Sequence, residues 1–247
     1  MPNLDKNDPV AAALVAAIQK GDVDGLRQML EKDPELSQAR VTATGNRGSE
    51  SRNLLHVATD WPGHFPGVAD SIKVLAEFGT DLNAGFGGWH NEKPLHWAAS
   101  SDDVSAIDAL LEAGADIEAP GSIFYNGTAM ADATIFAQWN AAKRLVERGA
   151  RTTFTEAAAL GLTDRLEAHL SGNPDVSPDE INPAFWMACH GGQQKAAEYL
   201  LNRGAELNWI PHWENLTPLD AAVRNKMTEV VEWLKSKGAI SRKGIFH

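Results

Sequence analysis

Apolar residues recur along this chain at helical spacing, in short stretches that end at a glycine. One face of a helix would hold the apolar residues Val104, Ile107, Leu110 and Leu111. This stretch ends at Gly114, which is followed by a small residue and an acid. Glycine suits this place because a chain commonly leaves a helix through a left-handed conformation. The pattern predicts a series of short amphipathic helices.

The glycine-ended stretches return at a nearly fixed interval. Gly79, Gly114 and Gly149 follow one another at steps of 35 residues. A second motif precedes each stretch, most clearly at residues 93–99, Lys-Pro-Leu-His-Trp-Ala-Ala. Proline favours the start of a helix because its missing N–H is not needed there. An interval of this length indicates a repeat array, in which neighbouring repeats bury each other's apolar faces.

These motifs resemble the ankyrin repeat, which begins Thr-Pro-Leu-His-x-Ala and returns about every 33 residues. Residues 94–96, Pro-Leu-His, and 114–116, Gly-Ala-Asp, carry the likeness most clearly, and it covers nearly the whole chain. The resemblance implies an all-α ankyrin-repeat solenoid of about seven stacked helix pairs, with hairpin fingers and a concave binding face. We expect one domain, residues 1–247, with approximate repeats at 8–52, 53–91, 92–126, 127–153, 154–182, 183–215 and 216–247.

The chain departs from the family pattern at three places. Residues 40–52 and 60–67 are insertions, and the pattern does not predict their conformation. Between the fourth and fifth repeats the interval shortens to 24 residues, so residues 151–153 should enter the next helix without a finger. We therefore expect the row of fingers to be interrupted after the fourth helix pair.

Charge and composition narrow the classes of partner. The chain has a net charge of −11, and its 22 Lys and Arg residues are scattered. Nucleic acid and anionic membranes both favour a clustered basic face, so we expect neither as a partner. No stretch approaches the roughly 18 apolar residues of a membrane span, and the N-terminus lacks a signal-peptide layout. A single cysteine and no suitably spaced histidine pair predict no metal site. We expect a cytoplasmic monomer without a cofactor.

The aromatic residues concentrate where the family resemblance places fingers and first helices, which line the concave side. Clustered exposed aromatics at finger tips favour a contact surface. Others, such as Trp97, fit a gap between repeats, and the tip at 209–215 has room to fold on itself. The predicted binding residues are Trp61, Trp89, His90, Phe124, Tyr125, Trp186, His190, Trp209, His212 and Trp213.

Histidines and acids in the repeat motif divide into structural and chemical candidates. The resemblance implies that His56 and His96 tie a finger to a helix by hydrogen bonds. Asp132 and Glu156 occupy a position that is apolar in most of the other repeats, next to the missing finger. A buried carboxylate beside aromatic rings is a candidate acid or base. The alternative is that each acid caps a helix or pairs with a nearby cation.

Two functions follow from these observations. The first is a binding module that recognises a protein partner through the aromatic-rich concave face, as the resemblance most often implies. The second is a small-molecule or enzymatic protein, with an aromatic pocket and Asp132 and Glu156 as catalytic residues. The sequence names neither a reaction nor a ligand, because a fold alone does not decide between them.

Overall fold

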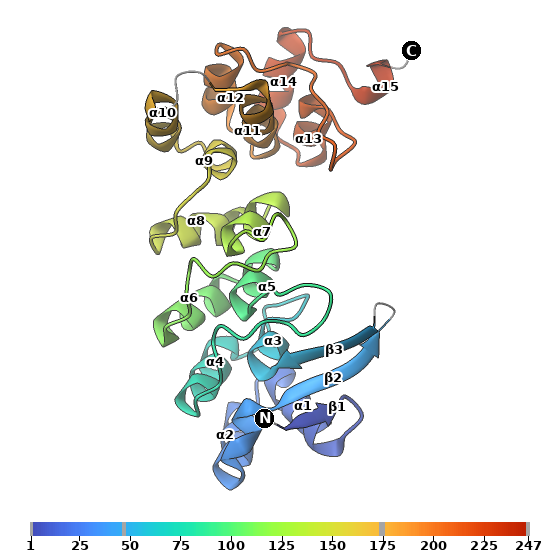
Figure 1. Ribbon diagram of the computed structural model, residues 1–247, viewed down its shortest axis with the longest axis vertical. Helices are drawn as coiled ribbons and strands as arrows, with labels where there is room; N and C mark the ends of the chain where they lie inside the picture. Colours follow the sequence, from blue (N-terminus) through green and yellow to red (C-terminus); the bar gives the residue numbers. More distant parts are fainter. Residues whose placement is uncertain (1, 46–47, 173–175, 246–247) are drawn as a thin grey trace. The chain divides into compact units, whose positions relative to one another are not determined.

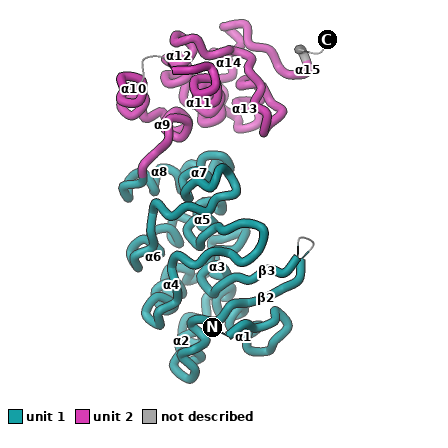
Figure 2. Tube along the Cα trace, in the orientation of Figure 1, with its two compact units in different colours: residues 1–150 teal, residues 151–247 magenta. Residues whose placement is uncertain are grey.

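A computed structural model of the protein describes residues 2–45, 48–172 and 176–245. The chain forms two compact units, Met1–Ala150 and Arg151–His247, which are coloured separately in Figure 2. The boundary between them lies at the place where the shortened interval predicts no finger. The expected single domain, residues 1–247, stays a prediction.

The first unit consists mainly of antiparallel helix pairs joined by fingers (Figure 1). In chain order the pairs are α1 (Pro9–Lys20) with α2 (Val23–Lys32), α3 (Leu54–Ala58) with α4 (Val68–Glu77), α5 (Pro94–Ser100) with α6 (Val104–Ala113), and α7 (Ala129–Ile135) with α8 (Trp139–Glu147). A short 3-10 helix, Pro34–Gln38, follows α2. The predicted all-α repeat class is confirmed for these segments.

Local signals set the ends of these helices. In α6 the Asp103 side chain accepts the backbone N–H of Ala106, which satisfies one of the free donors at the helix start. Gly114 then ends the helix with φ of 104°, a left-handed conformation that glycine adopts without strain. Between these ends, Ile107 and Leu110 are completely buried, as the apolar spacing predicted.

One part of the first unit is not helical. The insertion at 40–52 forms a hairpin of β2 (Arg40–Gly45) and β3 (Gly48–Asn53), and β1 (Asn3–Asp5) pairs in parallel with β2. The sheet order is β1-β2-β3, and Val41 lies opposite Arg52 while Ala43 lies opposite Glu50. Ser51 and Gly87 also exchange two backbone hydrogen bonds of 2.6 and 2.7 Å. The hairpin therefore takes the place of the first finger and pairs with the next one.

In the part that the structure describes, the second unit holds three helix pairs and one further short helix (Figure 1). They are α9 (Phe154–Leu160) with α10 (Thr163–Gly172), α11 (Pro178–His190) with α12 (Gln194–Leu201), α13 (Pro218–Arg224) with α14 (Thr228–Ser236), and then α15 (Arg242–Ile245). Thr153 caps α9 directly, so the predicted absence of a finger at 151–153 is confirmed.

The second unit has its own buried core. Phe185, Leu200 and Leu234 are fully buried in it, together with several alanines. At Gly191, a Cβ atom would lie 2.0 Å from the Ala159 carbonyl oxygen, so α9 and the end of α11 approach closely only because that residue lacks a side chain. Small residues thus allow the tight stacking that buries the larger ones.

Within the described residues, no helix has both the length and the apolar character needed to cross a membrane.

Candidate functional site

Three fingers carry seven of the ten predicted binding residues. We call them the Trp89 finger (residues 79–93), the Tyr125 finger (residues 114–128) and the Trp213 finger (residues 202–217). The first two belong to the first unit and the third to the second unit. Each finger is held to its unit by hydrogen bonds from a first helix, and those bonds determine which rings reach the surface.

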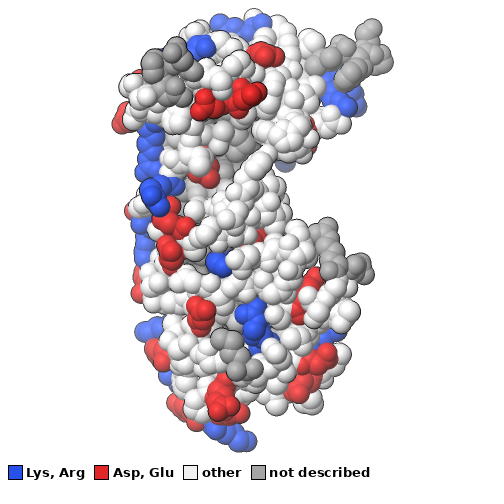
Figure 3. All heavy atoms as spheres, viewed as in Figure 1, with Lys and Arg blue, Asp and Glu red and all other residues white. Residues whose placement is uncertain are grey.

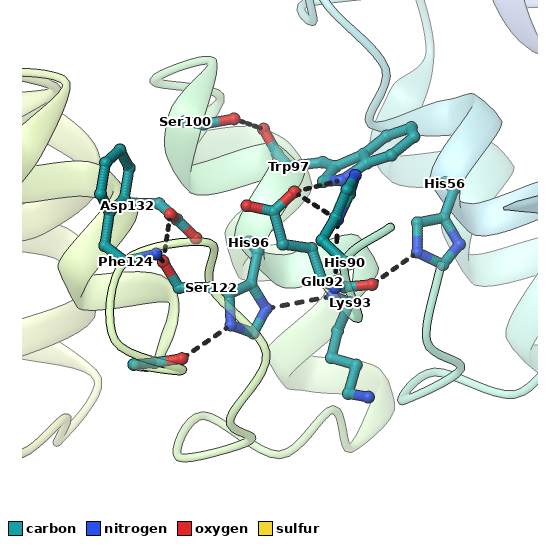
Figure 4. Close-up of polar contacts among 11 residues, drawn as sticks. His56, His90, Glu92, Lys93, His96, Trp97, Ser100, Ser122, Phe124 and Asp132 are labelled. Carbon is teal, nitrogen blue, oxygen red and sulfur yellow. Dashed lines mark hydrogen bonds and ion pairs between the residues drawn. The ribbon is translucent and has the colours of Figure 1, made fainter. Parts of the chain in front are cut away.

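His56 and His96 hold the first two fingers (Figure 4). His96 Nδ1 accepts the backbone N–H of Lys93 at 3.2 Å, and its Nε2 lies 3.3 Å from the Gly127 carbonyl oxygen. His56 Nε2 lies 3.0 Å from the Glu92 carbonyl oxygen. Burial lowers the pKa of His56 to about 3 and the pKa of His96 to about 4, so both are neutral at neutral pH. The predicted structural role of these histidines is confirmed.

Glu92 is the point where several elements of the first unit meet (Figure 4). Its Oε2 atom accepts the indole N–H of Trp97 at 3.1 Å and lies 3.1 Å from His90 Nδ1. The backbone N–H of Ile123, in the next finger, also bonds to this carboxylate. Burial raises the pKa of Glu92 above its ordinary value, while the hydrogen bonds oppose that shift. The side chain thus joins two successive fingers to α5.

The rings of the Trp89 finger support one another. Phe86 stacks on His90 with centroids 4.4 Å apart, and it packs against Trp97 at 5.4 Å. Trp89 meets His90 edge to face at 4.5 Å and remains 50% exposed. His90 itself is largely buried, with 10% of its side chain exposed. Of the two residues predicted at this tip, Trp89 forms the surface and His90 supports it.

The Tyr125 finger rests on Asp132. The Ser122 hydroxyl donates to Asp132 Oδ1 at 2.6 Å, and the Phe124 N–H donates to Ser122 Oγ at 3.0 Å. Phe124 packs edge to face against Phe136 at 5.3 Å. Tyr125 stands at the tip and is 78% exposed. Asp132 is completely buried beneath these groups, so its carboxylate fixes the finger.

Trp61 lies apart from the finger tips, at the start of the second insertion. It is the most exposed of the large hydrophobic residues, at 82%. The loop behind it is fastened to the turn before α6, because the His64 N–H donates to Asp103 Oδ2 at 2.6 Å and His64 Nε2 lies 3.0 Å from the Ser101 carbonyl. The structure therefore shows Trp61 on a fastened loop and does not group it with the finger-tip rings.

In the second unit the structure brings together five of the predicted residues. Trp213 meets Trp209 at 5.6 Å, Trp186 at 6.4 Å and His212 at 5.0 Å, each at a steep interplanar angle. Trp186 also stacks on His190 at 5.1 Å. Trp213 is 42% exposed and His212 is exposed, while Trp209 is half-buried. Trp213, His212 and Trp209 form the outer layer of this cluster.

Trp186 and His190 lie beneath that layer, which corrects their prediction as contact residues. Trp186 is 3% exposed and donates its indole N–H to the Leu216 carbonyl at 2.9 Å. His190 is 1% exposed, and its Nδ1 accepts from the Asn225 amide at 2.8 Å. Both side chains are occupied in holding the Trp213 finger and α13, so neither offers surface to a partner.

Glu156 has a capping role at the start of α9. Its Oε2 accepts the Thr153 N–H at 2.7 Å, and the Thr153 hydroxyl accepts the Glu156 N–H at 3.3 Å, which forms a capping box. Asp132 belongs to the first unit and Glu156 to the second, so the structure describes each carboxylate separately. Each carboxylate has a structural role within its own unit. This matches the structural alternative stated above and not the acid–base pair.

The buried thiol, the metal-ligating residue types and the cavity nearest the finger rings are the remaining candidates for chemistry. Cys189 is buried, and burial raises the pKa of its thiol, so it is a poor nucleophile. Among the described residues, no three His, Cys, Asp or Glu side chains gather as a metal site would require. A cavity beside Trp97 and Phe86 measures about 280 Å³, just below the ~300–1,000 Å³ range of small-molecule sites.

The sequence did not point to Glu92, because its importance depends on distant partners. The Glu92 side chain contacts Trp97 and His90 and accepts a hydrogen bond from the Ile123 backbone. The His56 ring contacts the Glu92 carbonyl oxygen. Only the fold brings Ile123 and His56 to Glu92. The one available signal was its place directly before the Lys-Pro-Leu-His motif. That place supplies the carbonyl oxygen to which the preceding repeat's His side chain bonds.

Comparison with known proteins finds ankyrin-repeat similarity in both units of the chain. A family model described as ankyrin repeats (3 copies) matches residues 154–243, and one described as ankyrin repeat matches residues 90–119. Over 121 residues, 49% of its length, the chain is 32% identical to Palmitoyltransferase AKR1 of Kluyveromyces lactis, and the match spans 15% of that protein. The crystal structure of the human ASB11 ankyrin repeat domain aligns with a TM-score of 0.49 at 20% identity, covering 92% of this chain and 84% of that chain.

Proposed function

Because the chain is an ankyrin-repeat protein, we propose that it is a binding module that recognises a protein partner through the tips of its aromatic fingers. The observation that carries this proposal is the exposure of a large ring at each finger tip. Trp89, Tyr125 and Trp213 are 50%, 78% and 42% exposed, respectively. Large rigid rings of this kind are enriched among the residues that dominate binding energy at protein interfaces.

The finger tips are built to present these rings in fixed positions. Behind Trp89 lie His90 and Phe86, which are stacked and largely buried. Behind Trp213 lies Trp186, which is hydrogen-bonded to the finger backbone. A ring held by its neighbours loses little conformational freedom when a partner binds, and this preserves affinity. The arrangement therefore favours contact with a partner over a role in filling the core.

The proposed function is tested by cross-linking in cells followed by measurement with the purified partner. Proteins cross-linked to the wild-type chain are compared with those cross-linked to Trp89→Ala and Tyr125→Ala variants. A genuine partner should be lost with the tip variants, and its affinity should fall by about 1–3 kcal/mol for either substitution. Melting temperatures should stay nearly unchanged, because the tips contribute little to the core.

Lys73→Ala provides the control, since Lys73 is exposed on the second helix α4, away from the finger tips. This variant should retain the partner at full affinity. A partner that binds both tip variants as tightly as wild type would rule out the finger tips as the contact surface. A large fall in melting temperature with intact binding would instead assign Trp89 and Tyr125 to the core.

A further inference from the structure

The cavity beside Trp97 and Phe86 is lined by both aliphatic and aromatic side chains. Val41 and Ala43 of β2 supply the aliphatic part, and Phe86 and Trp97 supply the aromatic part. The Trp97 N–H is already bonded to Glu92, so the tryptophan offers the cavity ring carbons and not a donor. At about 280 Å³, the space equals that of roughly nine water molecules at ~30 Å³ each. This is room for one side chain of a partner.

Four charged side chains border the cavity, and two of them neutralise each other. Arg52 forms an ion pair with Asp60 at the end of α3. Glu50 lies opposite Ala43 on the adjoining strand, and among the described residues its carboxylate has no hydrogen bond or ion pair. Lys6 is exposed beyond β1 and its ammonium group sits on a long flexible stem. The charge that is both half-buried and uncompensated is therefore the Glu50 carboxylate.

The net charge of the first unit is negative, like the charge of the Glu50 carboxylate. Residues 1–150 contain 21 Asp and Glu against 12 Lys and Arg, a net charge of −9. Figure 3 shows Lys and Arg side chains along the left edge of the molecule, where Figure 1 places α6 and α8. Arg144 on α8, and Arg148 directly after it, both pair with Asp108 on α6. The field of the unit thus favours the approach of a cationic group.

We propose that this cavity receives an arginine side chain of the protein partner, with the guanidinium on the Trp97 ring and its N–H groups donating to Glu50. A guanidinium is planar, stacks on aromatic rings and bonds to a carboxylate through two parallel N–H groups. A lysine ammonium lacks that planar fork and is more strongly hydrated. The proposal rests on the proposed function, because it specifies one residue of the partner.

Titration with single capped amino acids tests this inference without the partner. The probes are N-acetyl-arginine amide, N-acetyl-lysine amide and N-acetyl-glutamate amide, and the readout is the assigned indole N–H resonance of Trp97 in ¹⁵N-labelled protein. The arginine probe should shift this resonance in a saturable manner, the lysine probe should bind more weakly, and the glutamate probe should have no effect. Glu50→Gln should weaken the binding of the arginine probe by roughly twofold to fivefold, the effect expected of a partly exposed charge pair.

Glu31→Gln is the matched control, because Glu31 is an exposed carboxylate on α2. It should bind the arginine probe like wild type. Trp89→Ala and Tyr125→Ala should also leave the titration unchanged, so failure of this proposal and failure of the finger-tip proposal are distinguishable. Equal shifts with the glutamate probe, no shift with any probe, or wild-type affinity in Glu50→Gln would each overturn the arginine assignment.

Discussion

The two units fasten their fingers with different side chains that perform the same task. In the first unit, the ring nitrogens of His56 and His96 contact the carbonyl oxygens of Glu92 and Gly127. In the second unit, the indole N–H of Trp186 bonds to the Leu216 carbonyl. Each of these carbonyl groups belongs to the residue directly before the N-cap of the next first helix. A ring N–H aimed at that carbonyl is what the two units share.

This difference shows that the repeat specifies a hydrogen-bond donor at this position more strictly than a residue type. Histidine and tryptophan both supply a ring N–H on a flat, largely apolar side chain. Tryptophan fills more of the interior, whereas histidine can be protonated. In the second unit a larger side chain that does not titrate therefore replaces the titratable histidine. The stabilities of the two units should respond differently to truncation of this side chain and to acid.

Truncation of Trp186 should produce the largest effect. Trp186→Ala removes a buried ring and its hydrogen bond, and it should lower the free energy of unfolding by about 3–5 kcal/mol. Trp186→Phe retains a ring but leaves the Leu216 carbonyl without its donor, and it should cost about 1–3 kcal/mol. Urea unfolding followed by circular dichroism measures both values.

The matched control in the same unit is Trp213→Ala, which removes an exposed ring of equal size. Its cost should be smaller than that of Trp186→Ala, because Trp213 is already 42% exposed whereas Trp186 is 3% exposed. If Trp186→Phe were as stable as wild type, the indole hydrogen bond would not stabilise its unit as the hydrogen bonds of His56 and His96 stabilise theirs.

His96→Ala should have the next largest effect, now in the first unit. The substitution leaves the Gly127 carbonyl and the Lys93 N–H without their buried partner, which should cost about 1–3 kcal/mol at neutral pH. Urea unfolding at pH 7.5 measures this cost, and His212→Ala serves as the control because His212 is exposed. If both variants lost the same free energy of unfolding, the hydrogen bonds of His96 would not be the source of its contribution to stability.

The cost of removing His96 should shrink in acid. Burial lowers the pKa of folded His96 to about 4, below the ordinary value of about 6.5 that applies to the unfolded chain. The unfolded state therefore binds the proton first, and the stability contributed by neutral His96 is lost as pH falls from 6.5 toward 4. At pH 5 the cost of His96→Ala should be lower than at pH 7.5 by about 1–2 kcal/mol.

Trp186→Phe makes this comparison sharper, because an indole does not titrate in this range. Its cost should be the same at pH 5 and pH 7.5. The loss of unfolding free energy could instead depend on pH for Trp186→Phe, or be constant for His96→Ala. Either result would show that protonation of the histidine does not distinguish the two units.

The fold class could be predicted from sequence because its signals are local. Gly114 ends a helix, Pro94 begins one, and the apolar spacing between such marks sets the buried face. The three-stranded sheet could not be predicted, since its central pairs set Val41 against Arg52 and Ala43 against Glu50. Polar residues on the side facing the cavity leave no clear apolar alternation in β3, and β1 has only three residues.

The site was predictable only in part, for a related reason. Exposure of Trp89 and Tyr125 follows from their position at finger tips, where little core is available. The burial of Trp186 and His190 depends on the Trp213 finger folding back over them, which involves residues about 30 positions away in sequence. Its place on a first helix among other aromatic residues predicts a binding role for Trp186, but its N–H bonds to a finger carbonyl as His56 and His96 do.

Glu92→Gln should have the smallest effect, and it concerns a carboxylate joined to the histidine-tied fingers. Burial raises the pKa of folded Glu92 above its unfolded value, so the stability that its protonated form confers is present at low pH and is lost as pH rises through the folded pKa. Once this carboxyl group ionises, the wild type carries a partly buried charge. A glutamine amide retains an oxygen that takes the place of Oε2, so it still accepts the Trp97 N–H and lies beside His90 Nδ1. Thermal unfolding of Glu92→Gln at pH 7 should thus give a melting temperature equal to wild type or slightly higher, and the difference should disappear toward pH 4. A clear decrease at pH 7 would mean that the contact between Glu92 and His90 is a strong ion pair, whose attraction exceeds the cost of burying the carboxylate.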